Sequence, residues 1–313
     1  MFLGLNVFSM LKSLPLISIL LPVYNGEYTI KATLESLLAQ TYTHFEILVG
    51  IDGTYDGSKA IAESFKDARI KIIQHPQNLG LANNLNALIK ASAPEAAFFA
   101  MAEQDDVYVP ERLQWQIEVM KQHPEVGLVS GIAEFVSETR RDLFPGLLAY
   151  KKQFPQGDAL FKYLYENQLK VVNTCMMIRK ATHLRHELVF KNTYGNFNVD
   201  WDYVLRFSLV SKVHGISKVL VHMDRTSNRN SVTVNKWKQF AASRQLLKDF
   251  KKEFPELVNR KLYSKALKTH RKIEQGYRSK TGIVLYGFWY ALCHLDGYFL
   301  KYILMRKKKY LLN

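Results

Sequence analysis

Residues 16–53 read LISILLPVYNGEYTIKATLESLLAQTYTHFEILVGIDG and decide the fold. Two short apolar runs, 16–21 and 45–51, have the length and composition of buried strands. Between them, residues 29–40 repeat apolar side chains at helical spacing. A strand, a crossover helix and a second strand in this order place the two strands parallel in one sheet. The segment therefore predicts the beginning of an α/β fold.

The same alternation continues as far as residue 102. It predicts a helix, a strand, a helix and a strand at Ser58–Phe65, Ile70–Gln74, Leu81–Ser92 and Ala96–Ala102. This order predicts an α/β fold with a doubly wound, mostly parallel central sheet covered by helices on both faces. Such sheets bind ligands beyond the carboxyl ends of their strands, so the polar residues that follow each strand are candidates for a functional site.

Beyond residue 102 the pattern is less regular. We expect a helix at Pro110–His123, strand segments at Val126–Ser130 and Ile132–Val136, a loop over the site at Arg140–Gln156, a strand at Val171–Ile178, a helix at Asp202–Leu209 and a last strand at Val219–His222.

The net charge of +15 is concentrated at one end of the chain. Residues 236–313 hold 19 Lys and Arg against 5 Asp and Glu, whereas residues 1–235 are nearly neutral. A basic tail on a neutral body predicts attraction to an anionic surface. A phospholipid headgroup layer and nucleic acid are the two candidates.

The C-terminal region, residues 232–313, is basic, rich in aromatic residues and predicted to be helical. Residues 282–304 are apolar and aromatic, and a basic run, RKKK, follows at 306–309. The longest uncharged run, 282–293, is shorter than the ~20 residues that span a bilayer. An apolar helix with a basic end is typical of one that lies in the membrane interface. The alternative is a helix that packs on the body and leaves its basic end in water.

The cysteines and the N-terminus bear on the compartment. Cys175 and Cys293 fit neither a metal-binding spacing nor a disulfide framework, so we expect a reducing environment. The apolar N-terminus lacks a basic start and leads directly into the first strand, which is unlike a signal peptide. Together with the basic tail, these features predict a cytoplasmic protein, peripheral on the inner face of the cell membrane.

Polar residues follow all four strands of the alternating segment. The polar sites comprise Pro22, Val23, Tyr24, Asn25 and Glu27 after the first strand, Asp52 to Ser58 after the second, Asn78 and Gly80 after the third, and Glu103, Gln104, Asp105 and Asp106 after the fourth. An isolated Asp-Gly-Thr sequence is usually only a turn. Four polar sites in order on one sheet edge indicate a binding site.

These residue types suit a nucleotide sugar, which presents a base, a ribose and a diphosphate. The carboxylate of Asp52 can accept a hydrogen bond from a base N–H or a ribose hydroxyl. Glu103, Asp105 and Asp106 can hold Mg²⁺ or Mn²⁺, which bridges to phosphate oxygens and stabilises a departing diphosphate. The alternative for this acidic cluster is a charged surface turn that caps the helix beginning at Pro110.

Four motifs resemble those of glycosyltransferase family 2. They are PVYNGE at 22–27, DGTYDGS at 52–58, NLGLANNLN at 78–86 and EQDDVYVPERL at 103–113. The resemblance implies the type-A glycosyltransferase fold, with residues 15–136 as the donor-binding half. It also implies that Asp52 contacts the base, that Asp105 is the metal carboxylate, and that Asp106 supports it.

The motifs depart from the family pattern at three places. The usual paired acids appear as Ile51-Asp52, so only one acid remains. The first acid of the family's Asp-X-Asp motif is replaced by Glu103. The glutamate side chain is longer than aspartate, so Glu103 can contact either the ribose or the metal. The usual Asn-X-Gly appears as Asn86-Ala-Leu, which weakens the expected donor contact of Asn86.

The acceptor half, residues 137–231, contains NVDWDYVLRF at 198–207. This segment resembles the acidic motif from which the family supplies a general base. Asp200 matches the expected base, with Asp202 as the alternative, and a helix cap is the structural interpretation of Asp200. On the acceptor side we also expect Trp201, His222 and Arg225.

The leading hypothesis is an inverting, metal-dependent glycosyltransferase with residues 1–231 as its catalytic domain. The donor is expected to be a nucleotide sugar, with a UDP-sugar favoured. The acceptor is expected to be a lipid-linked saccharide of bacterial envelope polysaccharide, lipopolysaccharide or glycan synthesis. An anionic membrane surface is the expected partner and nucleic acid is not. The alternative hypothesis is a non-catalytic basic protein that binds nucleic acid or another anionic polymer through the tail.

Overall fold

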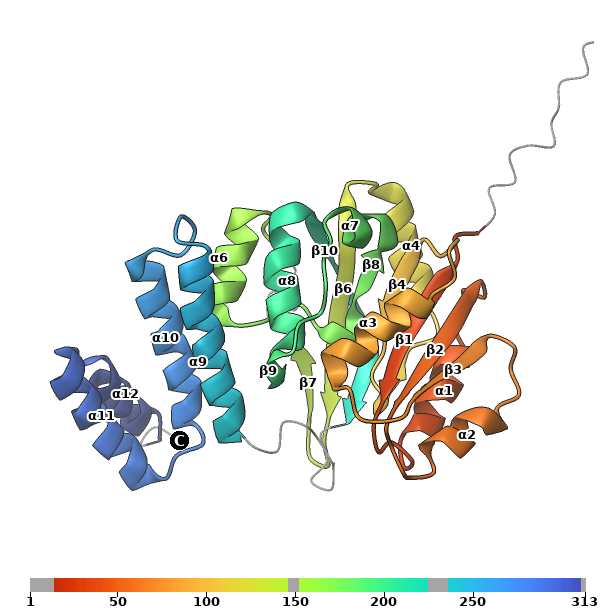
Figure 1. The fold of residues 1–313 in the computed structure, drawn as a ribbon. Coiled ribbons are helices and arrows are strands. Elements are labelled where there is room, and N and C mark those ends of the chain that lie inside the picture. The colour runs from red at the N-terminus through yellow and green to blue at the C-terminus, as the bar shows by residue number, and fades with distance from the viewer. Residues whose placement is uncertain (1–13, 146–151, 225–235, 311–313) are drawn as a thin grey trace, which may run out of the picture. The chain divides into compact units, whose positions relative to one another are not determined.

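A computed structural model gives the fold and describes residues 14–145, 152–224 and 236–310, with side chains as far as residue 305 (Figure 1). The chain divides into two compact units. Unit 1 comprises Met1–Leu164 and Leu169–Asn235, and unit 2 comprises Tyr165–Gln168 and Lys236–Asn313. Unit 1 contains the central sheet, and unit 2 contains the C-terminal helices.

Unit 1 has ten described strands, and all of them except β9 belong to one sheet. Those described are β1 Ile17–Val23, β2 Phe45–Asp52, β3 Ile70–His75, β4 Phe98–Met101, β5 Asp106–Tyr108, β6 Val126–Val136, β7 Arg141–Phe144, β8 Met177–Arg179, β9 Thr193–Asn196 and β10 Lys212–Asp224. The sheet has nine strands in the order β3-β2-β1-β4-β8-β6-β10-β5, and β7 pairs with β6.

Most strands of this sheet run in one direction. β1 is parallel to β2 and β4, β2 is parallel to β3, and β6 is parallel to β10. β8 lies antiparallel between β4 and β6, so the strands on its two sides share a direction. The prediction of a mostly parallel sheet in an α/β fold is confirmed.

Helices cover both faces of the sheet. Those of unit 1 are α1 Ile30–Leu38, α2 Ser58–Ser64, α3 Leu81–Ala91, α4 Arg112–Gln122, α6 Asp158–Asn167, α7 Lys180–Arg185, α8 Val199–Val210 and the short 3₁₀-helix η2 Asn173–Cys175, although α6 ends in unit 2. On one face, Leu21 of β1, Leu34 of α1 and Ile117 of α4 belong to one buried hydrophobic cluster. On the other face, which carries α3, α7 and α8 in Figure 1, the ring of Phe99 in β4 lies 5.7 Å from that of His183 in α7.

Two predicted elements differ from the structure, and one strand of the sheet lies outside every predicted element. The expected strand at 171–178 is the helix η2 followed by the short strand β8, because polar side chains of η2 are used at the sheet edge. The expected loop at 140–156 begins with β7, which forms a hairpin with β6, and residues 146–151 lie outside the described chain. The strand β5, which pairs with β10, was not predicted from the sequence.

Unit 2 consists of helices α9 Lys236–Glu253, α10 Arg260–Gln275, α11 Lys280–His294 and α12 Tyr298–Tyr310. The prediction of a helical C-terminal region is confirmed. The prediction of a single helix at 282–304 is wrong, because the segment forms α11 and α12 with a turn between them. At this turn Leu295 takes the left-handed conformation at φ 48°, and Asp296 accepts the backbone N–H of Tyr298. No helix among the described residues is both long and apolar enough to cross a membrane.

The buried carboxylate of Glu46 ties the beginnings of several strands together, far from the ligand edge. Its Oε1 atom accepts the Ser18 hydroxyl at 2.6 Å and the Ala93 N–H at 2.8 Å, and its Oε2 atom accepts Lys71 Nζ at 2.7 Å. Burial alone would raise the pKa of Glu46, but these hydrogen bonds outweigh it and hold the pKa below the ordinary value. The ionised form is therefore the one that stabilises the fold.

We predict that Glu46→Gln lowers the free energy of unfolding by about 1–3 kcal/mol near pH 7. The loss should shrink at about pH 3, because a carboxylate with a depressed pKa stabilises the fold above its unfolded pKa and loses that contribution as pH falls. Urea unfolding at both pH values measures this. Glu63→Gln, at a carboxylate that pairs on the surface with Lys59, is the control and should change little. An equal loss at both pH values would contradict the assignment.

Candidate active site

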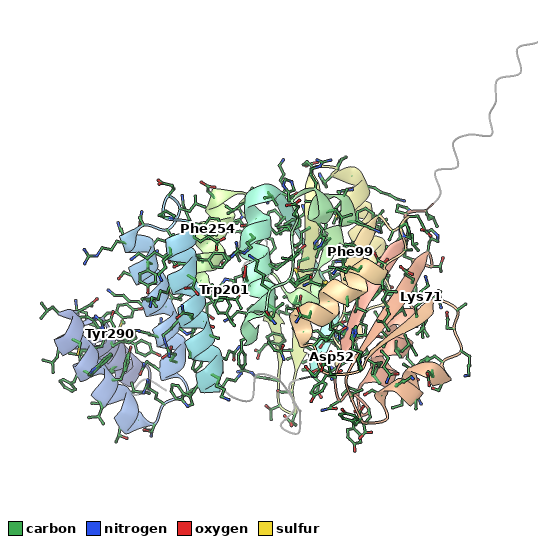
Figure 2. All side chains as sticks on the ribbon, viewed as in Figure 1. Asp52, Lys71, Phe99, Trp201, Phe254 and Tyr290 are labelled. Carbon is green, nitrogen blue, oxygen red and sulfur yellow. The ribbon has the colours of Figure 1, made fainter. Side chains whose placement is uncertain are left out.

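The four polar sites of the sequence meet at one edge of the sheet. β3, β2, β1 and β4 are neighbours and run parallel, so their carboxyl ends lie side by side. Asp52 marks this edge in Figure 2, at the end of β2. The predicted convergence of the four loops on one edge of the sheet is therefore confirmed by the topology.

Asp56 joins the loops that follow β1 and β2. Its Oδ2 atom accepts the Glu27 N–H at 3.0 Å, and its Oδ1 atom accepts the Ser58 N–H at 3.0 Å. In return, Glu27 Oε2 accepts the Gly57 N–H at 2.9 Å, and Ser58 Oγ accepts the Gly26 N–H at 2.9 Å. Burial would raise the pKa of Asp56, but the hydrogen bonds from Ser58 and its neighbours lower it below its ordinary value. The first two loops thus form one hydrogen-bonded unit.

Gln104 joins the first loop to the acidic motif after β4. Its Oε1 atom accepts the Tyr24 N–H at 2.8 Å, and its Nε2 atom donates to the Tyr24 carbonyl at 3.0 Å. The Asn25 backbone, at φ 52°, donates its N–H to Thr54 Oγ1 at 3.2 Å. Gln104 and Asn25, both predicted to bind the donor, therefore also hold the loops in place, while the Tyr24 side chain is exposed.

Asp52 fixes the turn that follows β3. Its two carboxylate oxygens accept the N–H groups of Leu79 at 2.7 Å and Gly80 at 3.0 Å. The same Gly80 N–H lies 2.9 Å from Asn78 Oδ1. Gly53 has φ +64°, and a Cβ atom there would lie 2.3 Å from the Asn78 nitrogen, so only glycine fits this close approach. The turn is therefore positioned by the Asp52 carboxylate together with the side-chain oxygen of Asn78.

The acidic cluster lies after β4 as predicted. Each of Glu103, Asp105 and Asp106 offers a carboxylate oxygen within 4.8 Å of the others. Asp106 is fully buried, whereas Glu103 and Asp105 are partly exposed. Three carboxylates this close repel one another unless a cation lies between them, and hard cations such as Mg²⁺ and Mn²⁺ prefer these oxygen ligands. The donor set fits a divalent ion, and the interpretation as a solvated surface turn does not fit the burial of Asp106.

Three residues around the acidic cluster were not predicted from the sequence. Asn173 of η2 donates its Nδ2 to Glu103 Oε1 at 2.8 Å. Tyr108 of β5 accepts the Glu103 N–H at 2.8 Å on its hydroxyl, which also lies 2.5 Å from Thr174 Oγ1. The signal for Asn173 and Thr174 was the polar pair Asn-Thr inside the apolar run 171–178, whereas Tyr108 lies within the motif at 103–113. They hold Glu103, whose extra reach was the open point of the sequence interpretation.

Arg112 places a buried positive charge beneath the cluster. The side chain is fully buried, donates to the Met101 carbonyl at 2.7 Å, and stacks on the Tyr108 ring at 4.5 Å. Burial lowers the pKa of the guanidinium, while nearby groups that include Asp106 oppose the shift. A guanidinium remains charged even so, and it partly compensates the carboxylates.

A loop from the second half of unit 1 contacts the third donor loop. Asn196, in β9, accepts the Leu81 N–H at 3.0 Å on its Oδ1 atom and so caps α3. Asn86 donates to the Phe190 carbonyl at 2.8 Å and accepts the Phe190 N–H at 3.1 Å. The side-chain amide of Asn86 therefore holds the loop that contains Phe190. These two hydrogen bonds explain the asparagine without any contact to the donor.

Helix α8 begins just after this loop and carries the two candidate bases. Asp200, in its first turn, accepts the Trp201 N–H at 2.8 Å, and burial raises the pKa of Asp200 above its ordinary value. Asp202 is buried and pairs with Arg206 Nε at 2.5 Å. Trp201 is only 3% exposed and donates its indole N–H to the Leu164 carbonyl, so it offers almost no surface to an acceptor. It is labelled on α8 in Figure 2.

The remaining acceptor-side predictions lie on or beyond β10. His222 Nδ1 lies 2.8 Å from Glu134 Oε2, which also accepts Arg141 at 3.0 Å. His222 is thus held near the carboxyl end of β6. Arg225 lies outside the described residues.

A cavity of about 600 Å³ lies at the opposite edge of the sheet, where β6 and β10 begin, and is lined by none of the predicted site residues.

The sequence matches the family described as Glycosyl transferase family 2 over residues 18–185. It is 36% identical over 223 residues to an uncharacterized glycosyltransferase of Rickettsia prowazekii, covering 68% of this chain and 66% of that protein. It is 35% identical over 105 residues to the Escherichia coli UDP-Glc:alpha-D-GlcNAc-diphosphoundecaprenol beta-1,3-glucosyltransferase WfgD. That match covers 34% of this chain and 41% of the E. coli enzyme, so the chain spans less than half of that relative.

Two solved structures have a similar fold. S. aureus TarS, in a complex with UDP-GlcNAc, gives a TM-score of 0.58 at 17% identity over 76% of this chain and 67% of that chain. The mannosyltransferase PcManGT of Pyrobaculum calidifontis, in a complex with GDP-Man and Mn²⁺, gives 0.55 at 14% identity over 95% of this chain and 85% of that chain. The expected type-A glycosyltransferase fold is confirmed.

We predict that Asn173→Ala weakens Mn²⁺ binding by about 10–100-fold, because a side chain that orients a metal-binding carboxylate contributes that much to affinity. Calorimetric titration of the protein with Mn²⁺ measures the change. Gln114→Ala removes an exposed amide that bonds to Glu118 on the same helix, and should leave the affinity unaltered. An Asn173→Ala protein that binds Mn²⁺ as tightly as the native protein would contradict the orienting role.

Proposed function

Because the chain belongs to glycosyl transferase family 2, we propose that it transfers a sugar from a nucleotide-sugar donor to a hydroxyl group of a saccharide acceptor. The observation that carries this proposal is the cluster of Glu103, Asp105 and Asp106 at the edge where four strand-end loops converge. A donor diphosphate needs positive charge beside it, and a carboxylate cluster supplies that charge only by holding a cation. The catalytic domain in this proposal is residues 1–231.

The donor in this proposal is a UDP-sugar bound across the loops after β1, β2 and β3. Two similarities support uridine: the name of the E. coli relative specifies UDP-Glc, and the TarS structure contains UDP-GlcNAc. Each oxygen of Asp52 accepts one backbone N–H and keeps a second lone pair for a base N–H or a ribose hydroxyl. The exposed ring of Tyr24 offers a face on which the base can stack.

The metal in this proposal is Mg²⁺ or Mn²⁺, with Asp105 as its principal ligand and Asp106 as the supporting carboxylate. A bound divalent ion would neutralise the diphosphate as it leaves the sugar. The Mn²⁺ in the PcManGT structure supports the choice of ion. The chain's own contribution is positional: Asn173 and Tyr108 hold Glu103, and Gln104 keeps the first loop against the acidic motif.

The general base in this proposal is Asp200. A base must be free to take a proton from the acceptor hydroxyl, and Asp202 is already committed to Arg206. Burial raises the pKa of Asp200, which makes its carboxylate a better proton acceptor than an exposed aspartate. One in-line attack by the deprotonated hydroxyl inverts the anomeric carbon. The β-linkage in the name of the E. coli relative supports an enzyme of this kind.

The acceptor in this proposal is a lipid-linked saccharide of bacterial envelope polysaccharide, lipopolysaccharide or glycan synthesis. The support is the diphosphoundecaprenol-linked acceptor in the name of the E. coli relative. In this proposal His222, whose imidazole is held by Glu134, contacts the acceptor. Trp201 is assigned to packing because of its burial.

We predict that Asp200→Asn lowers kcat for transfer from a UDP-sugar to a diphosphate-linked lipid saccharide by about 10²–10⁴-fold. Asp202→Asn is the matched control: it should lower thermal stability by breaking the pair with Arg206, with kcat reduced less than about tenfold. In the native enzyme kcat should fall as acid protonates Asp200, with a midpoint above the ordinary aspartate pKa, because burial raises the pKa. Transfer of radiolabelled sugar measures the rates, and NMR of the product gives the anomeric configuration.

Two outcomes would overturn this account of the base. One is full activity in Asp200→Asn together with loss of activity in folded Asp202→Asn. The other is a product that retains the anomeric configuration of the donor. Absence of transfer from any nucleotide sugar by the native protein, with tight and salt-sensitive binding of nucleic acid, would favour the basic binding protein instead.

A further inference from the structure

Helix α11 has one apolar face that is fully used inside unit 2. The ring of Tyr290 lies 4.7 Å from that of Phe299, which follows the turn into α12. A Cβ atom at Gly287 would lie 2.7 Å from Ile303 Cδ1, so the two helices approach closely at this glycine. This inner face accounts for the packing of α11 against α12.

The opposite face of α11 is also apolar and lies exposed. Leu285, Phe288, Trp289 and Leu292 occur at positions i, i+3, i+4 and i+7, and are 70%, 57%, 49% and 78% exposed. Leu295, at the end of the helix, extends this surface and is 95% exposed. We call these five residues the α11 outer face. No charged residue occurs between Lys280 and His294. A helix that faces water on one side normally carries polar residues there, so this face is built for an apolar partner.

The chain around this face is strongly basic. From residue 276 to residue 313 the sequence has seven Lys and Arg and one acidic residue, Asp296. Asp296 forms an ion pair with Lys268, so its charge is compensated within unit 2. Lys280 and Lys301 are exposed. An apolar surface within a basic segment is complementary to an anionic phospholipid bilayer, in which acyl chains lie beneath negative headgroups.

We propose that the α11 outer face is the surface by which the protein docks on an anionic phospholipid bilayer, with α11 lying in the interface. Leucine and phenylalanine side chains enter the acyl boundary, and Trp289 suits the headgroup level because its ring is apolar and its N–H is polar. Docking depends on no step of the transfer reaction. Its consequence, that the enzyme is held where lipid-linked acceptors reside, rests on the proposed function.

Cys293 gives a direct test in the full-length chain. This thiol is exposed beside the outer face, whereas Cys175 is buried, so a polarity-sensitive fluorophore reacts selectively at Cys293. We expect a blue shift and increased emission when vesicles containing phosphatidylglycerol are added, and little change with pure phosphatidylcholine. Unchanged emission with anionic vesicles would overturn the proposal.

Vesicle sedimentation of variants tests the individual side chains. Leu285→Glu/Leu292→Glu should bind anionic vesicles at least about tenfold more weakly, because each inserted leucine changes partitioning by about that factor. Leu184→Glu, at a leucine 55% exposed on α7 of unit 1, is the matched control and should bind like the native protein. Circular dichroism melting checks that all three proteins are folded. Equal binding by the double variant and the control would contradict the assignment.

The same variants separate membrane docking from self-association. A second copy of the chain could also cover an apolar face, and sedimentation velocity without lipid measures it. We expect the native protein and the double variant to have the same mass in solution. A native dimer that the double variant converts to a monomer, with no vesicle binding by either, would show that the α11 outer face binds a second copy and would overturn the membrane proposal.

Discussion

The carboxylate of Asp52 accepts the backbone N–H groups of Leu79 and Gly80, and the geometry of the site depends on this contact. It fixes the turn between β3 and α3, so α3 begins at a defined point. Asn196 then bonds the first N–H of α3, four residues before Asp200. The segment that leads into the proposed base is therefore hydrogen-bonded to the turn at the donor edge.

A second constraint is the concentration of negative charge at the same edge. Glu103, Asp105 and Asp106 lie together where burial makes repulsion costly, and the fold compensates through the buried Arg112 and through polar groups that hold Glu103. Such an arrangement is suited to a divalent cation. The basic excess of the chain lies elsewhere, in unit 2, where it accompanies the α11 outer face. Negative charge is therefore concentrated at the acidic cluster, and positive charge in the unit that carries the α11 outer face.

The sequence predicted the parallel strands and the loops at their ends, because the alternation of apolar runs and amphipathic segments is local. It did not predict contacts between distant residues. Asn173 and Glu103 are 70 residues apart, and Asn196 and Leu81 are 115 apart, so no local pattern connects them. The sequence also did not show which side chains form hydrogen bonds inside the fold. Asp52 binds the turn after β3, Asn86 binds the Phe190 backbone, and Trp201 binds the Leu164 carbonyl. The family resemblance identified the motifs, while their division into ligand-facing and loop-holding residues required the structure.

Calorimetric titration with UDP, GDP and dTDP, each with and without Mn²⁺, tests the central claim most directly. The claim is that the loops and carboxylates at this sheet edge form a metal-dependent nucleotide site. We predict that UDP binds best, that binding requires Mn²⁺, and that Asp105→Ala abolishes it while a folded Asp249→Ala control on α9 does not. Absence of nucleotide binding under every condition, or binding that is unchanged both without Mn²⁺ and in Asp105→Ala, would contradict this prediction.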